Sequence, residues 1–398
     1  MVEVMKLKRL IILLLCILAI YCCFNYQNIG FLNEIIDIYH YQLNIINQDK
    51  NLIKETDIFL NNGPIINQNN NKHEGIYKQY YYEHLNSDKQ KLYNEIYQGI
   101  CSFDDKISVS SNDINEIEEI FMMIVNDNPH LFYFDPSKQQ SMLTSFLNNN
   151  ELRLSYIMNE EEVQEMNAKL REVTTSIIDK ASILNSDIEK VQYVYDFIID
   201  HCDYVIDADN NQNILSVFIN QESVCAGYAR SMKYLLDFLD IESCVLVGKS
   251  KDDTHATLMA RIDGNYYYFD PTWGDPIIEK KDQKSYNANM RYTYFAMSDE
   301  DLNLYFKADY PEIMQNSNSN KENYFIANDL YIDSYDTFIA LLKDKANNKN
   351  MIFKCSNEQL FNEIIDSLTN DQEVAKILKS SYTLQYDPYL YSISITKK

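Results

Sequence analysis

The chain has 398 residues, enough for two to three domains of ordinary size. It is 46% apolar and 24% charged, with only 8 Gly and 7 Pro, which excludes a disordered tail and collagen-like or Pro/Gly-rich low-complexity architectures. Its 35 Lys and Arg against 59 Asp and Glu give a net charge of −24. Phosphate backbones would repel such a chain, so we expect no general nucleic-acid binding.

The first 30 residues have the pattern of a membrane segment. Lys6, Lys8 and Arg9 precede an unbroken apolar run over residues 10–24, the order of charged and apolar regions in a signal sequence. The run is short for a full span, but no small-residue cleavage site follows it. We predict an uncleaved single-pass anchor at the cell membrane, with the body outside the cytoplasm because the positive charges are N-terminal. A cleaved signal peptide, which would give a secreted protein, and a buried core helix are the alternatives.

Residues 31–74 are predicted to form a stalk or linker, because polar, turn-rich stretches at residues 61–64 and 69–71 interrupt them. Residues 75–160 are predicted to form an N-terminal α/β segment. Its expected elements are a helix that follows Asp113, where the apolar residues have helical spacing, and short strands at residues 130–134 and 152–158.

Residues 161–310 are predicted to form the central core. Its expected elements are a helix at residues 161–178, a helix that starts with a capping box of Ser186 and Glu189, a strand at residues 243–247 and a strand at residues 291–297. A small C-terminal α+β unit is predicted at residues 321–398, after a polar run. Its expected elements are a helix at residues 335–346, a strand at residues 350–355, a helix capped by Ser356 with Gln359, and a closing strand at residues 389–396.

Five of the eight cysteines lie in the body: Cys101, Cys202, Cys225, Cys244 and Cys355. Five is an odd number, so at least one thiol is unpaired in any intramolecular scheme and has to be considered as a reactive group. The body contains no CxxC motif and no pair of histidines at metal-ligand spacing. The sequence therefore predicts no metal site.

Cys225 stands at the predicted start of a helix. Ala229, Met232 and Leu236 recur behind it at helical spacing, and Ser223 is the expected N-cap. A thiol in the first turn of a helix lies at the positive end of the macrodipole, which favours the thiolate. The free backbone N–H groups of that turn can bind an oxyanion.

A β-hairpin is predicted from two strands, residues 255–262 and 265–270, joined by Asp263-Gly264. This dipeptide is a favoured two-residue turn, so Ile262 should pair with Asn265. This pairing determines where Asp270 and His255 lie relative to each other.

In this register Asp270 faces Thr257 and His255 faces Thr272. Because side chains alternate along a strand, His255 and Asp270 become diagonal neighbours on one face. A carboxylate at that place can hold the imidazole in one tautomer, and the helix start would supply the thiol. Together they form a Cys-His-Asp arrangement for acyl transfer.

Other residues have a simpler interpretation. Cys244 lies in an apolar strand and is expected to be a core residue, since cysteine is among the most buried residue types. His201-Cys202-Asp203 looks like a second triad, but adjacent residues on a helix or strand do not face one another. Asp275 is the less favoured alternative to Asp270, because it lies beyond the predicted strand.

These blocks resemble the transglutaminase-like superfamily of papain-like cysteine enzymes, and residues 186–276 carry the resemblance. The matching stretches are Val224-Cys225-Ala226-Gly227-Tyr228-Ala229, His255-Ala256, Asp263-Gly264-Asn265-Tyr266-Tyr267 and Asp270-Pro271-Thr272-Trp273-Gly274-Asp275-Pro276. Thr257-Leu258 departs from the Trp-Asn that many members carry after His-Ala, which concerns the shape of the cleft wall.

The resemblance implies a bacterial, membrane-anchored member of α+β class. Its papain-like core would have a Cys at a helix N-terminus, packed on an antiparallel sheet that carries His and Asp, with small flanking α/β segments. Cys225 corresponds to the nucleophile, His255 to the base and Asp270 to the orienting acid. Members of the superfamily include protein cross-linking enzymes, peptidases, peptide-N-glycanases and inactive domains.

We therefore expect a thiol enzyme that acts on peptide or protein amides at the cell surface, as a peptidase, amidase or transglutaminase, without metal or organic cofactor. The Cys225 N–H would hold the oxyanion with a second donor, for which Gln221 and Tyr204 are the candidates. The alternative is a non-catalytic surface module that binds peptide or cell-wall material in the same cleft.

Overall fold

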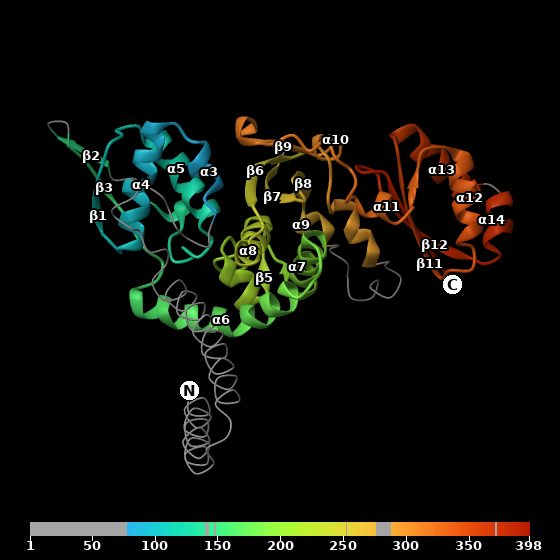
Figure 1. The fold of residues 1–398 in the computed structure, drawn as a ribbon, viewed down its shortest axis with the longest axis horizontal. Coiled ribbons are helices and arrows are strands. Elements are labelled where there is room, and N and C mark those ends of the chain that lie inside the picture. Colours follow the sequence, from blue (N-terminus) through green and yellow to red (C-terminus); the bar gives the residue numbers. More distant parts are fainter. Residues whose placement is uncertain (1–77, 140–142, 147–148, 252, 276–287, 371) are drawn as a thin grey trace, which may run out of the picture. The chain divides into compact units, whose positions relative to one another are not determined.

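The computed structural model describes residues 78–139, 143–146, 149–251, 253–275, 288–370 and 372–398. This part of the chain has a mixed α and β fold (Figure 1), which confirms the expected mixture of helices and sheets. The predicted anchor and stalk, residues 1–74, lie outside the described residues. Within the described ranges no helix is long and apolar enough to cross a membrane.

The N-terminal segment consists of helices beside a small antiparallel sheet. Its elements are α3 (Tyr80–His84), α4 (Ser87–Cys101), α5 (Ile114–Asp127), η1 (Pro136–Lys138) and the strands β1 (Lys106–Val109), β3 (Asn149–Arg153) and β2 (Leu143–Phe146), in the order β1-β3-β2. Asp113 caps α5, and its carboxylate accepts the N–H of Asn115; Glu116, expected to complete a capping box with it, instead accepts the Ser111 hydroxyl. The segment is tied to the central sheet, since the Tyr81 hydroxyl donates to the carbonyl oxygen of Val245 at 2.8 Å.

Two predicted strands of this segment differ from the structure. Residues 130–134 form consecutive turns, with the N–H of Leu131 on the Asn128 carbonyl and the N–H of Phe134 on the Leu131 carbonyl. Leu131, Phe132 and Phe134 are all buried. The apolar run therefore marks a buried loop, because burial needs apolar side chains but not a ladder. The strand predicted at residues 152–158 ends at Arg153.

The central sheet is antiparallel, in the order β8-β7-β6-β9, with the helices α7 and α8 beside it in Figure 1. Its strands are β6 (Ser243–Ser250), β7 (Asp253–Ile262), β8 (Asn265–Phe269) and β9 (Phe306–Ala308). The helices and short elements around it are α6 (Glu160–Ser182), α7 (Asp187–His201), β4 (Asp203–Tyr204), the π-helical turn η2 (Ser216–Asn220), β5 (Glu222–Ser223), α8 (Cys225–Phe238), α9 (Pro271–Gly274), η4 (Ala288–Tyr294), α10 (Asp299–Asn303) and η5 (Pro311–Ile313). The capping box of Ser186 and Glu189 at the start of α7 is confirmed.

The register of the β7–β8 hairpin is the predicted one. Ile262 pairs with Asn265, and the ladder continues to Leu258 opposite Phe269. The turn residues have the left-handed backbone that this type of turn requires, with φ of 50° at Asp263 and 84° at Gly264.

The strand predicted at residues 291–297 is instead the 3₁₀-helical η4, followed by a single bridge of Met297 to Tyr268. Its hydroxyls and carbonyls bond to other elements: the carbonyl oxygen of Arg291 accepts the Tyr195 hydroxyl at 2.8 Å. The β-forming residues here pack between helices and the sheet, so tertiary contacts override their propensity.

The C-terminal part has a second sheet, in the order β10-β11-β13-β12, and its own buried cluster around Phe338, Phe353 and Ile393. Its elements are α11 (Tyr324–Ala327), β10 (Tyr331–Ile332), α12 (Tyr335–Asp344), β11 (Asn350–Cys355), α13 (Glu358–Asn370), α14 (Gln372–Leu378), β12 (Tyr382–Asp387) and β13 (Ser392–Lys397). The predicted cap of α13 is wrong by one residue, since the Leu360 N–H bonds to the Asn357 side chain and not to Ser356.

Candidate active site

Cys225 is the first residue of α8, as the spacing predicts. The residue before it, Val224, is extended and offers no side-chain cap, so the prediction of Ser223 as N-cap is wrong. The Ser223 hydroxyl instead bonds to the carbonyl oxygen of Asn211 at 2.8 Å and to the Ser216 hydroxyl at 2.6 Å. It holds the preceding loop against the helix start. Cys225 is partly exposed, unlike Cys202, Cys244 and Cys355, which are buried.

Gly227 makes this close packing possible. A Cβ atom at this position would lie 2.0 Å from the Ser223 hydroxyl, 2.7 Å from the Ser216 hydroxyl and 2.9 Å from the Asn211 carbonyl oxygen. Only glycine permits the loop and the first turn of α8 to approach this closely. The position of Cys225 is therefore set by packing behind it.

His255 lies on β7 and Asp270 follows the last residue of β8. The structure brings them together, with His255 Nε2 and Asp270 Oδ2 2.6 Å apart. The pair is buried: His255 is 6% exposed and Asp270 is fully covered. A short, buried bond of this kind fixes one orientation of the imidazole.

The route to this contact differs in part from the prediction. The ladder ends at Phe269, and Thr272 belongs to α9, so His255 has no strand partner at that place. Asp270 instead caps α9, and its Oδ1 accepts the Trp273 N–H at 3.0 Å. One carboxylate oxygen therefore faces the helix and the other faces His255.

Two tyrosines that sequence reasoning missed hold Asp270. The Tyr305 hydroxyl donates to Asp270 Oδ2 at 3.1 Å, and the Tyr195 hydroxyl donates to the Asp270 carbonyl oxygen at 3.2 Å. Tyr195 is on the buried face of α7. Its helical spacing with Ile198 could therefore have indicated that Tyr195 faces the core. Tyr305 lies 35 residues after Asp270, and no local pattern connects the two.

Aromatic rings cover the pair. The ring centroids of Trp273 and Phe306 lie 6.4 and 6.1 Å from that of His255, both edge-on. Rings in this position exclude water from the bond between His255 and Asp270, which strengthens it.

The charges around His255 favour its protonated form. Burial by itself would lower the pKa of His255, but the charge and hydrogen bond of Asp270, followed by the hydrogen bond and charge of Cys225, raise it to about 10. The imidazole thus interacts with the Asp270 carboxylate and with Cys225. The carboxylate stabilises the imidazolium form of His255.

The rival residues lie elsewhere. The Asp275 carboxylate accepts the Tyr228 hydroxyl at 2.7 Å, and burial raises the pKa of Asp275 to about 6. The His201 ring stacks on Phe197 at 4.7 Å between centroids. Neither contact involves His255.

The five described cysteines are all free thiols. Burial raises the pKa of Cys101, Cys202 and Cys355 to about 12, and that of Cys244 well above its ordinary value. Within the described ranges no group of three or more His, Cys, Asp or Glu residues could hold a metal ion.

No protein-family model matches the chain, and no curated protein matches it. Similar solved structures include a candidate cysteine protease from Cytophaga hutchinsonii, at 22% identity over 26% of this chain and 37% of that one, with a TM-score of 0.24. Another is a protein described as a TGase, at 16% identity over 38% of this chain and 53% of that one, with a TM-score of 0.25. A third is a candidate protease from Parabacteroides distasonis, at 15% identity over 32% of this chain and 35% of that one, with a TM-score of 0.21. Each match covers less than two thirds of the other chain's length.

Proposed function

We propose that the chain is a thiol-dependent acyl-transfer enzyme with a transglutaminase-like, papain-like core, acting on peptide or protein amides at the cell surface. Cys225 is the nucleophile, His255 its proton-transfer partner and Asp270 the group that orients His255. The observation that carries the proposal is the buried 2.6 Å bond between His255 and Asp270, with Cys225 close enough to raise the pKa of the same imidazole.

The reaction follows from these positions. The Cys225 sulfur attacks the amide carbonyl carbon, and the C–S bond forms as the carbonyl oxygen takes up negative charge. The imidazolium of His255 gives its proton to the leaving nitrogen, the C–N bond breaks, and a free amine departs. A thioester remains on Cys225. Water or a second amine then attacks the thioester, and His255 takes the proton of the attacking group. The C–S bond breaks, and the Cys225 thiolate is released together with a carboxylic acid or a new amide.

Asp270 acts through His255. Its Oδ2 accepts the Nε2–H, so that Nδ1 is left for the thiol and the reacting groups. The negative charge also stabilises the imidazolium throughout the cycle. Tyr305 and the N–H of Trp273 keep the carboxylate in that orientation.

The test uses p-nitrophenyl acetate as an activated acyl donor, with the full-length protein. We expect a burst of about one p-nitrophenolate per chain and an acetyl group on Cys225, found by peptide mass spectrometry. The Cys225→Ser variant is the control and should show neither. Partition of the acetyl group between water and added glycine ethyl ester then separates a hydrolase from a transferase. A wild-type chain that forms no acetyl-Cys225 would contradict the enzyme and favour a module that only binds.

We further propose that residues 1–30 anchor the protein in the cell membrane with its body outside the cytoplasm, on the strength of the basic and apolar pattern alone. Extraction of membranes with carbonate should leave the protein in the pellet, and protease added to intact cells should remove the body. Release by carbonate, or protection from protease, would contradict this placement.

A further inference from the structure

An acyl-transfer site needs two hydrogen-bond donors for the oxyanion, and the Cys225 N–H supplies only one. The sequence leaves Gln221 and Tyr204 as the candidates for the second. The structure places these two side chains differently. Gln221 Nε2 lies 3.4 Å from His201 Nε2, on the exposed surface, and the Gln221 backbone is left-handed with φ of 60°. The Gln221 amide is therefore engaged with His201.

Tyr204 is held beside the nucleophile by the backbone. The strand β4 pairs in parallel with β5, so that Tyr204 lies opposite Ser223, two residues before Cys225. The N–H groups of Asp203 and Val205, on either side of Tyr204, donate to the carbonyl oxygens of Gln221 and Ser223 at 2.9 Å. The Tyr204 backbone is thus fixed to the segment that leads into α8.

The ring of Tyr204 lies along the first turn of α8. Its centroid is 6.3 Å from that of Tyr228, which stands three residues after Cys225 on the same helix. Tyr228 is itself fixed, because its hydroxyl donates to the Cys202 carbonyl oxygen at 2.8 Å and to Asp275 Oδ2 at 2.7 Å. The rigid neighbour limits where the Tyr204 ring can lie.

Within the described part of the chain the hydroxyl of Tyr204 has no hydrogen-bond partner, and the residue is only partly buried. Burial first, and then the negative charges of Cys225, Asp253 and Asp270, raise the pKa of Tyr204. The hydroxyl is therefore a protonated donor at neutral pH. A donor without a partner, on a backbone that is fixed beside the segment leading into Cys225, is what a developing oxyanion requires.

We propose that the Tyr204 hydroxyl is the second oxyanion donor of this site, acting together with the backbone N–H of Cys225. This assignment rests on the proposed acyl-transfer function. It makes Tyr204 a catalytic residue, because its O–H bonds the carbonyl oxygen of the substrate only when that oxygen becomes charged.

Two reagents for Cys225 separate this role from an effect on the thiol itself. Acylation by p-nitrophenyl acetate passes through a tetrahedral oxyanion as the C–S bond forms and p-nitrophenolate leaves. Alkylation by iodoacetamide forms a C–S bond with loss of iodide and creates no oxyanion. Loss of one oxyanion donor costs about a hundredfold or more in rate. We therefore expect Tyr204→Phe to lower acylation about a hundredfold and to leave alkylation at the wild-type rate.

The Phe variant keeps the ring that packs on Tyr228, and Gln221→Ala is the matched control for the rival donor. Gln221→Ala should change neither rate. Acylation of Tyr204→Phe at the wild-type rate, an equal fall of both of its rates, or a hundredfold fall of acylation in Gln221→Ala would each overturn the assignment. A wild-type chain that alkylates but does not acylate would refute the proposed function, and this assignment with it.

Discussion

At the scale of single residues, the site depends on one carboxylate that serves three donors. Asp270 accepts from His255 and Tyr305 on one oxygen and from the Trp273 N–H on the other. A buried carboxylate is tolerated only when such bonds replace its hydration. The same bonds keep the charge where it stabilises the His255 imidazolium.

The raised pKa of His255 predicts how stability depends on pH. The folded-state value of about 10 lies above the ordinary 6.5, so the folded chain binds this proton more tightly than the unfolded chain does. The resulting stabilisation is fully present below about pH 6.5 and is lost as the pH rises through about 10. Wild type should therefore exceed Asp270→Asn in free energy of unfolding by a margin that shrinks over this range, measured by urea denaturation. A margin that stays constant with pH would contradict the ion pair.

At the scale of elements, the sequence predicts those that depend on neighbouring residues better than those that depend on distant ones. The hairpin of β7 and β8 could be predicted because turn residues and alternation are local signals. The contact of His255 with Asp270 was predicted from this register, but Asp270 makes it as the cap of α9, beyond the end of the ladder. The strand β9 could not be predicted, because it has only three residues and pairs with β6, which is distant in the sequence. Tyr305, which directly precedes β9, was missed for the same reason.

Gly248 allows β9 to pair with β6. It pairs with His255 on one side and with Ala308 on the other. A Cβ atom at Gly248 would lie 2.2 Å from the Lys307 carbonyl oxygen. This oxygen belongs to the backbone, so it can move only if the strand β9 shifts. The edge strand therefore reaches β6 only because this position has no side chain.

We expect Gly248→Ala to lower the free energy of unfolding by about 1–3 kcal/mol, as overpacking does. Gly264→Asn is the matched control, because Gly264 has φ of 84° with no atom within 4 Å, and Asn tolerates a left-handed backbone. It should stay within about 0.5 kcal/mol of wild type. Denaturant unfolding of both variants checks this, and equal effects of the two substitutions would contradict the account of β9.

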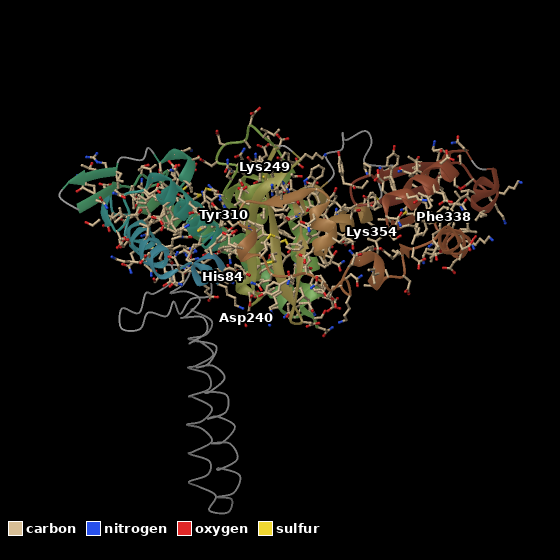
Figure 2. All side chains as sticks on the ribbon, turned by 90° about the horizontal axis from the view of Figure 1, so that it is seen from above. His84, Asp240, Lys249, Tyr310, Phe338 and Lys354 are labelled. Carbon is tan, nitrogen blue, oxygen red and sulfur yellow. The ribbon has the colours of Figure 1, made fainter. Side chains whose placement is uncertain are left out.

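At the scale of the whole molecule, the C-terminal part contacts the surroundings of the site. The Tyr294 hydroxyl donates to Asp387 Oδ2 at 2.7 Å, and Lys354, labelled in Figure 2, donates to Asp301 Oδ1 at 2.6 Å. The sequence could not predict these two hydrogen bonds, because each joins segments more than fifty residues apart. The domain boundaries remain predictions from composition.

Tyr389 extends this contact to the indole beside His255. The Lys251 ammonium lies 3.9 Å from the Tyr389 ring centroid and 4.5 Å from that of Trp273, the only tryptophan in the chain. A cation over two rings is attracted by both. Tyr389 also packs directly on Trp273, with ring centroids 6.1 Å apart.

Tyr389→Leu should therefore expose the indole and shift its fluorescence emission to longer wavelength, and the signal is unambiguous because Trp273 is the sole emitter of its kind. Tyr386→Leu is the control, since Tyr386 packs on Phe361 and is already 52% exposed. An unchanged spectrum in Tyr389→Leu, or the same shift in both variants, would show that the C-terminal part does not cover the site.

The most direct test of the central claim is the rate of iodoacetamide labelling of Cys225 against pH, by peptide mass spectrometry on the full-length protein. Wild type, His255→Ala and Cys225→Ser are compared. The other described thiols have raised pKa values, so labelling near neutral pH reports Cys225. We predict that wild-type Cys225 labels rapidly below pH 7 and that His255→Ala abolishes this low-pH labelling. Slow labelling with ordinary thiol pH dependence, unaffected by His255→Ala, would contradict it.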